Sequence, residues 1–276
     1  MKVAWFTPVG RDDPEAEYSR VVLAAMVQLC DVLLCCDRPP DGFPSGIRVL
    51  EYATATARPA DLGSLDAIFY VLGNDVAQHT SIFEMSRLHP GIVVLRDATL
   101  HRFFLDYYLG RLRRPDLYVT RMADHYGVKG LAAAQLVLEP WFDGGEARIE
   151  ERDLLRYTFA EEALRSASGA VIHSGLLEAV VPGRWNGPVC AEPLPAGLFT
   201  SPVVARDYAR GLLEFAEQRV PRPGARSADD EASRDLAERI AGQIGETLAS
   251  LGASPDMPGV GPVIQEVSRI LWPPSG

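Results

Sequence analysis

The sequence predicts an α/β fold, a single Rossmann-like, doubly wound and mostly parallel sheet with a C-terminal helical extension. Short apolar runs alternate with segments of helical periodicity from Lys2 to Arg219, and this alternation indicates parallel strands joined by right-handed crossovers. The length of 276 residues allows one large domain plus an appendage. A chain of this size buries enough core to fold without disulfides or a structural metal.

Each strand is predicted by a short apolar run that ends at turn-forming residues. The first run ends at Pro8, and the fourth ends at the sequence Gly73-Asn74-Asp75. The predicted strands are Lys2–Thr7, Asp31–Cys36, Ile47–Tyr52, Asp66–Leu72, Ile92–Leu95, Ala170–His173 and Val189–Leu194.

Helices are predicted where apolar residues recur at helical spacing. Ser201 stands directly before the last of them and is expected to be its N-cap. Gly127 and Gly130 punctuate the middle of the chain. The predicted helices are Glu15–Leu29, Gln78–Leu88, Leu100–Leu112, Leu117–Tyr126, Lys129–Leu138, Arg152–Arg165, a short helix through Val181, and Pro202–Arg219.

These elements imply four parts in the chain. Residues 1–200 form the Rossmann-like domain, and the helix 201–219 packs back on it. Residues 220–230 read as a linker, since they are rich in proline and polar residues and offer little to bury. Residues 231–276 form a helical extension with two amphipathic helices.

Charge and composition exclude several classes of partner. Lys and Arg number 27 against 37 Asp and Glu, a net charge of −10, which argues against nucleic acid and against an anionic membrane surface. The longest apolar run, Val21–Val27, is far too short for a membrane span, and no signal peptide is visible. We therefore expect a cytoplasmic protein with four reduced cysteines, and no metal or other cofactor.

Polar residues follow two neighbouring predicted strands and form the most informative group in the chain. In open α/β sheets the ligand crevice lies outside the carboxyl ends of the strands, so these residues could converge on one pocket. The alternative is structural: Asn74 in a turn, Asp97 as an N-cap, and both histidines in packing. The candidate ligand-binding residues are Asn74, His79, Arg96, Asp97 and His101.

The same stretch carries a recognisable order of residues. Leu-Gly-Asn ends at Asn74, His79 follows, His-Pro-Gly-Ile-Val-Val-Leu ends at Leu95, and Asp97 and Leu-His ending at His101 complete it. This order resembles the N-terminal, acceptor-side half of GT-B-fold glycosyltransferases of the retaining family-4 type. The resemblance is moderately specific over residues 70–101.

Weaker similarity to that family extends over about residues 1–218. It includes the segment Tyr126–Gly130, the sequence Ala-Val-Ile-His-Ser ending at Ser174, the sequence Glu-Pro-Leu-Pro ending at Pro195, and the helix after Ser201. The resemblance adds further candidate ligand-binding residues, which are Tyr18, Ser19, His173 and Ser174.

The chain also departs from the family pattern in three places. Leu198 leads directly into the terminal helix, where the family has a second Rossmann-like domain that holds the nucleotide-sugar. The loop 8–13 stands where the family has a glycine-rich loop, which would let a ligand approach the backbone. Arg96 replaces a common histidine, and an arginine keeps its charge and cannot titrate.

Three functions remain open at this level. The favoured one is a non-catalytic accessory or binding protein derived from a glycosyltransferase, with a sugar or nucleotide-sugar ligand and a catalytic glycosyltransferase or a second copy as partner. It predicts an exposed apolar patch. The alternative is an active glycosyltransferase completed by a partner chain or oligomer, with Arg96 on the anion and His79 or His101 near the acceptor hydroxyl. The third is an unrelated α/β protein that binds a small molecule.

Overall fold

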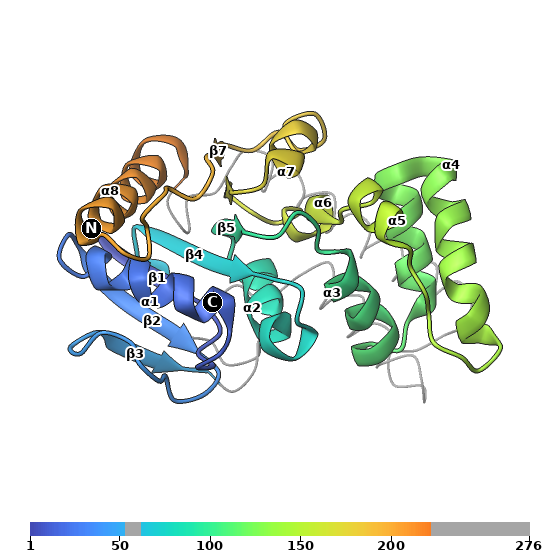
Figure 1. Cartoon of the computed structure of the whole chain (residues 1–276), viewed down its shortest axis with the longest axis horizontal. Helices are drawn as coiled ribbons and strands as arrows, with labels where there is room; N and C mark the ends of the chain where they lie inside the picture. Colours follow the sequence, from blue (N-terminus) through green and yellow to red (C-terminus); the bar gives the residue numbers. More distant parts are fainter. Residues whose placement is uncertain (53–61, 222–276) are drawn as a thin grey trace, which may run out of the picture. The chain divides into compact units, whose positions relative to one another are not determined.

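The computed structural model describes residues 1–52 and 62–221, and these form an α/β fold around one parallel sheet (Figure 1). The sheet has seven strands in the order β3-β2-β1-β4-β5-β6-β7, so the predicted fold class is confirmed. The chain divides into units Met1–Pro223 and Gly224–Gly276. The second unit, with the expected helical extension 231–276, lies outside the described residues.

The strands fall where the apolar runs predict them, and every end except that of the last strand agrees within one residue. Neighbouring strands pair in parallel throughout, for example Trp5 of β1 with Leu34 of β2 and Phe69 of β4. The last strand is shorter than expected and ends at Ala191. The strands are β1 (Lys2–Phe6), β2 (Asp31–Cys36), β3 (Arg48–Glu51), β4 (Ala67–Leu72), β5 (Ile92–Leu95), β6 (Gly169–Ile172) and β7 (Val189–Ala191).

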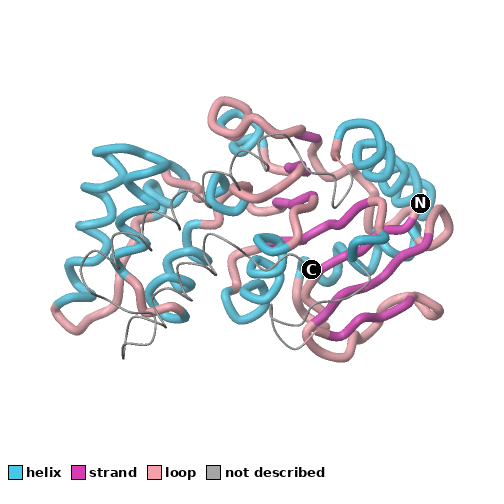
Figure 2. The backbone as a smooth tube through the Cα atoms, turned by 180° about the vertical axis from the view of Figure 1, so that it is seen from behind, coloured by secondary structure: helices cyan, strands magenta, loops and turns pink. Residues whose placement is uncertain are grey.

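Helices cover both faces of this sheet and complete the doubly wound arrangement (Figures 1 and 2). A single-turn 3-10 helix, η1 (Leu62–Ser64), precedes β4, and a π-helical turn, η2 (Tyr107–Arg111), follows α3. The α-helices are α1 (Pro14–Met26), α2 (Val76–Leu88), α3 (His101–Asp106), α4 (Pro115–Phe142), α5 (Glu151–Arg156), α6 (Ala160–Ala163), α7 (Gly175–Val180) and α8 (Pro202–Arg219).

Two hydrophobic cores lie on opposite faces of the sheet, as the alternation of side chains along a strand requires. Val3 and Trp5 of β1 pack with α1 and α8, whereas Ala4 and Phe6 pack with α2, α3 and α4. The α8 helix matches its predicted bounds, and its Tyr208 hydroxyl lies 2.8 Å from the Tyr18 hydroxyl of α1. The terminal helix therefore packs against the first helix of the chain.

The middle helices agree with the prediction at one residue with positive φ and differ from it at another. The two segments predicted as separate helices, Leu117–Tyr126 and Lys129–Leu138, lie on either side of a break within α4 at Gly127, where a φ of 64° and a ψ of −150° are not helical, so the predicted division is confirmed. The single helix predicted over Arg152–Arg165 is instead α5 and α6. Phe159 separates them, since it adopts the left-handed region with a φ of 56°.

The chain order creates a switch point in the sheet. From β1 the chain winds outward to β3 on one side, then returns to β4 on the other side of β1. Crossovers on the two sides of this point leave a crevice beyond the carboxyl ends of β1 and β4. None of the described helices has the length and apolar character that a transmembrane segment needs.

Candidate functional site

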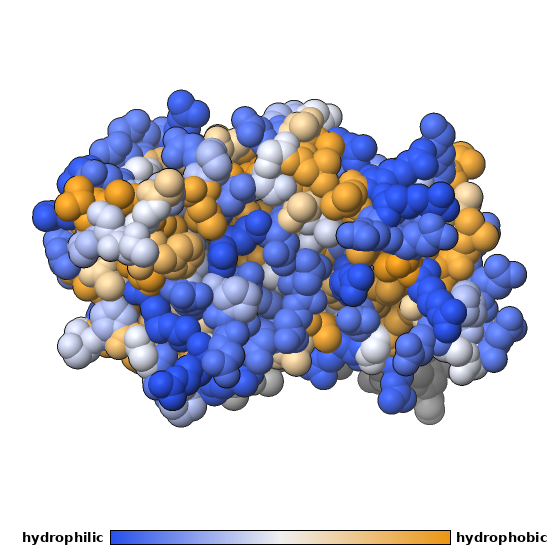
Figure 3. All heavy atoms as spheres, viewed as in Figure 1, coloured by the Kyte–Doolittle hydropathy of each residue, from blue (hydrophilic) through white to orange (hydrophobic). Residues whose placement is uncertain are grey.

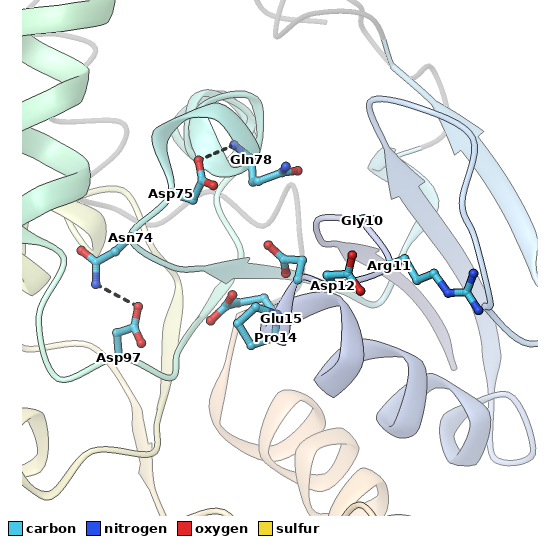
Figure 4. A pocket seen from close by; sticks show the side chains of 10 residues that line it. Gly10, Arg11, Asp12, Pro14, Glu15, Asn74, Asp75, Gln78 and Asp97 are labelled. Atoms are coloured by element: carbon cyan, nitrogen blue, oxygen red, sulfur yellow. Dashed lines mark hydrogen bonds between the residues drawn. The ribbon is translucent and has the colours of Figure 1, made fainter.

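A polar crevice lies outside the carboxyl ends of β1, β4 and β5, at the switch point of the sheet (Figure 4). Its volume of about 530 Å³ falls within the range of small-molecule sites. Five carboxylates and one arginine stand among its residues. The lining residues are Gly10, Arg11, Asp12, Asp13, Pro14, Glu15, Asn74, Asp75, Gln78 and Asp97.

The first wall of the crevice is the start of α1. Asp13 is the N-cap of this helix, and its carboxylate accepts a hydrogen bond of 2.8 Å from the backbone N–H of Ala16. Pro14 follows at the first helical position, where it lacks an N–H group. Glu15 comes next and is almost fully buried. This helix start therefore presents carboxylates where phosphate-binding folds present free backbone N–H groups.

The second wall is formed by the ends of β4 and β5. The Asn74 side-chain amide donates to the Asp97 carboxylate at 2.9 Å and to the carbonyl of Thr99 at 2.6 Å, and Figure 4 shows Asn74 and Asp97 facing each other. The structure thus brings together these two residues of the predicted constellation. Asp75, which caps α2 by accepting from Ala77, completes this wall.

Arg96 lies behind the crevice, and its guanidinium contacts neighbouring residues of the protein. Its guanidinium donates to the Pro14 carbonyl, lies 3.9 Å from the Glu15 carboxylate and stacks 5.0 Å from the centre of the Tyr18 ring. The side chain is only 16% exposed. The charge of Arg96 therefore offsets Glu15 and stabilises the inner wall.

Glu15 also faces His79, which is fully buried on α2 behind the crevice. Glu15 Oε2 lies 4.0 Å from His79 Nε2, too far for a hydrogen bond. Burial, reinforced by the charges of Asp13 and Asp97, raises the pKa of Glu15 to about 7. Burial likewise lowers the pKa of His79. Both shifts reduce the charge that this pair carries near neutral pH.

Two of the predicted residues lie inside the protein rather than at the crevice. The ring nitrogens of His101 are both engaged, one by the Tyr157 carbonyl and the other by the Tyr118 hydroxyl at 2.8 Å. Burial lowers the pKa of His101 to about 4. Ser19 is buried as well, and its hydroxyl accepts a hydrogen bond of 2.9 Å from the Trp5 indole.

Tyr18 and His173 belong to a chain of hydrogen bonds beneath α8. The Tyr18 hydroxyl bonds to Tyr208, which lies 2.8 Å from His173 Nε2, and His173 Nδ1 donates to the Glu192 carbonyl at 2.7 Å. Ser174 is the residue before α7, and its side chain makes no capping hydrogen bond. These residues do not line the crevice.

The sequence reasoning missed the residues that line most of the first wall. They are Arg11, Asp12, Asp13 and Glu15, and the exposed Asp75 of the second wall was missed too. A signal for them exists in the sequence. Two acidic residues followed by proline and a third acidic residue stand in the loop between the first strand and the first helix, where a nucleotide-binding fold has glycines.

Chemically, the crevice is rich in hydrogen-bond acceptors and poor in fixed positive charge. Carboxylates accept hydrogen bonds and bind cations, while the amide of Gln78 and the guanidinium of Arg11 can donate. The two N–H groups of the Asn74 amide are already used within the wall. Comparisons of the chain with protein-family models, with curated proteins and with solved structures found no match.

Proposed function

We propose that this protein binds a neutral, hydroxyl-rich sugar in the crevice at the switch point, as a glycosyltransferase-like binding or accessory protein. One observation carries the proposal, which is the polar lining of the crevice, with five carboxylates, two amides and a single arginine. Ligand pockets are usually lined mostly by apolar side chains, so this lining favours a ligand that is polar over most of its surface.

The hydrogen-bonding groups of the lining match those of a sugar. Each sugar hydroxyl both donates and accepts, so it pairs with carboxylate oxygens as a donor and with amide or guanidinium N–H groups as an acceptor. The carboxylate of Asp12 and the amide of Gln78 belong to opposite walls, so a ligand between them can meet both (Figure 4). A hydrogen bond that involves a carboxylate contributes about 1.5–3 kcal/mol.

The same lining argues against a nucleotide-sugar. A diphosphate in the crevice would face the carboxylates of Asp13 and Glu15 at the start of α1, where Pro14 also removes a backbone donor. Residues 192–201 join β7 directly to α8, at the place where the resembling family has its nucleotide-sugar domain. These observations support a role on the acceptor side, without transfer by the described residues alone.

An accessory role also needs a surface for a partner, which we propose to be a catalytic glycosyltransferase chain or a second copy. The described residues include exposed hydrophobic side chains on α4, namely Val128, Leu136 and Phe142. Figure 3 shows hydrophobic residues gathered over α4 on the face that it draws. They are compatible with the apolar patch that the accessory role predicts.

A binding screen tests the proposal. Titration calorimetry and saturation-transfer NMR would compare neutral mono- and disaccharides with UDP-glucose and GDP-mannose. We expect saturable binding of a neutral sugar, weakened at least tenfold by Asp12→Ala and by Gln78→Ala. Glu17→Ala is the matched control, since Glu17 is exposed on the same helix start but does not line the crevice.

Two results would overturn this function. One is binding of the nucleotide-sugars in preference to every neutral sugar, and the other is sugar transfer catalysed by the purified chain. Equal loss of sugar binding in the Glu17→Ala control would show a general charge effect and would also contradict the proposed site.

A further inference from the structure

Three potential metal ligands converge at the inner end of the crevice. They are the carboxylates of Asp13 and Glu15, at the start of α1, and the imidazole of His79 on α2, and one ligand atom of each lies within 4.8 Å of the others. The segments that supply them lie at least 64 residues apart in the sequence. The three residues therefore do not follow one another at the short spacing by which metal-binding motifs are recognised in a sequence.

The histidine provides an observation that is independent of the acidic residues. His79 is fully buried, and within the described residues its Nε2 atom has no hydrogen-bond partner. Its Nδ1 lies 3.2 Å from the carbonyl of Val71, so it is placed to donate there and to leave the lone pair of Nε2 free. A ligating histidine commonly donates its second nitrogen to a carbonyl in this way.

The backbone leaves room for an ion between these groups. A Cβ atom at Gly73 would lie 2.9 Å from His79 Nε2 and 3.0 Å from the Glu15 carboxyl carbon, so glycine is the residue that keeps this space open. Asp97 adds negative charge nearby, since it raises the pKa of Glu15. The charge of Arg96 offsets only part of this excess.

We propose that Asp13, Glu15 and His79 bind a divalent first-row transition ion of the Zn²⁺ or Mn²⁺ class. Imidazole nitrogen is a good ligand for transition metals, whereas Mg²⁺ and Ca²⁺ are bound by oxygen. Three protein ligands leave further coordination positions for water or for a hydroxyl group in the crevice. This inference does not rest on the proposed sugar site.

The separation of the ligands is compatible with such an ion after small movements. Two ligands at about 2.1 Å from one ion are about 3.4 Å apart at the tetrahedral angle, so the 4.0 Å between Glu15 and His79 has to close by roughly 0.6 Å. Asp13 is the most exposed of the three and keeps its second carboxylate oxygen while the first caps α1. The remaining pairs, at up to 4.8 Å, have to close by at most roughly 1.4 Å to reach the same separation.

Metal titration of the full chain tests the proposal without any sugar. After removal of metals with EDTA, Zn²⁺ would be titrated in competition with a chromophoric chelator, Mn²⁺ by electron paramagnetic resonance and Co²⁺ by its visible absorption. We expect one ion per chain, no thiolate-to-cobalt band from the half-buried Cys30 or Cys190, and stronger binding of Zn²⁺ or Mn²⁺ than of Mg²⁺.

Variants that remove one ligand atom at a time locate the ion. Glu15→Gln, Asp13→Asn and His79→Gln are each expected to weaken binding at least tenfold. Asp75→Asn is the matched control, because Asp75 also caps a helix and lines the crevice but is not among the three ligands. It should change binding less than twofold. Asparagine caps helices as well as aspartate does, so both cap variants retain the fold.

Three results would overturn the metal site. The first is no binding of Zn²⁺, Mn²⁺ or Co²⁺ to the parent chain. The second is an equal loss in Asp13→Asn and Asp75→Asn, which would indicate only the general negative charge of the crevice. The third is a thiolate band that accounts for all the bound cobalt. Neutral sugar binding that persists in EDTA is a separate result and bears on the proposed function alone.

Discussion

Buried glutamates occur in two regions of this molecule, and their surroundings are opposite. In the helical layer, Glu162 accepts hydrogen bonds of 2.8 Å from the Tyr108 hydroxyl and 2.9 Å from His125, and Arg121 lies 3.5 Å away. At the crevice, Glu15 has other carboxylates as neighbours, with Arg96 at 3.9 Å and His79 at 4.0 Å. The negative charge of Glu162 is balanced by hydrogen-bond donors and by Arg121, whereas that of Glu15 is balanced only in part, by Arg96.

The pKa values of the two carboxyls show the consequence. Burial alone would raise the pKa of Glu162, but hydrogen bonds from His125 and Tyr108 and the charge of Arg121 hold it below its usual value. The pKa of Glu15 rises instead to about 7. A folded protein keeps an uncompensated buried carboxylate at a cost in stability, and such groups are concentrated at functional sites.

The largest expected effect comes from breaking the compensated cluster. Glu162→Ala should lower the free energy of unfolding by about 3–5 kcal/mol, because the buried Tyr108 hydroxyl and the partly buried Arg121 and His125 all lose the same carboxylate. Urea unfolding followed by circular dichroism measures this loss. Glu178→Ala, at an exposed position on α7, is the control and should stay within about 0.5 kcal/mol of the parent. A loss as small as the control's would mean that the cluster is not structural.

The buried histidines extend the comparison to pH. His101 has both nitrogens engaged and a folded pKa of about 4, whereas the unfolded chain binds the proton near pH 6.5. Stability is therefore present above pH 6.5 and is lost as the pH falls towards 4, by about 3 kcal/mol from this residue. Between pH 7 and pH 4 the free energy of unfolding of the parent should fall by about 3 kcal/mol more than that of His101→Gln. Parallel curves would contradict the assignment.

The smallest effect has the opposite sign and concerns the crevice. In EDTA at pH 8, Glu15→Gln should raise the free energy of unfolding by about 1 kcal/mol, since the amide carries no charge that burial penalises. The folded pKa is raised above the unfolded value of 4.5, so the gain should shrink as the pH falls below 7 and disappear near pH 4, where Glu15 is protonated in both states. Glu17→Gln on the same helix should change stability little at either pH. Destabilisation of Glu15→Gln at pH 8 would place Glu15 among the structural glutamates.

Much of the fold could be predicted from the sequence, because apolar runs buried on both faces of a parallel sheet stand out from their surroundings. The break at Gly127 could be predicted as well, because a glycine between two segments of helical periodicity indicates a helix end. The break at Phe159 could not, since Phe159 is a bulky residue in a left-handed conformation and stands directly before α6. Its backbone N–H donates to the Tyr126 hydroxyl, a tertiary contact that no local pattern describes.

The candidate site was predictable in part for a similar reason. Asn74 and Asp97 follow adjacent parallel strands, so their proximity is a consequence of topology. Whether a histidine after such a strand faces the crevice or the core depends on helix rotation, which places His101 among aromatic rings. The approach of Glu15 to His79 depends on the conformation of a loop that joins a strand to a helix, which no spacing rule describes.

The bond between Tyr18 and Tyr208 has a consequence for how the protein is made. It joins residues 190 positions apart, on helices that together cover one face of the sheet. At about 5–20 residues per second, a ribosome needs roughly 10–40 s to synthesise the segment between them. During that interval the nascent chain carries Trp5 and its neighbours without the α8 cover. The first strands therefore complete this face of the core only after the last helix of the domain has been synthesised.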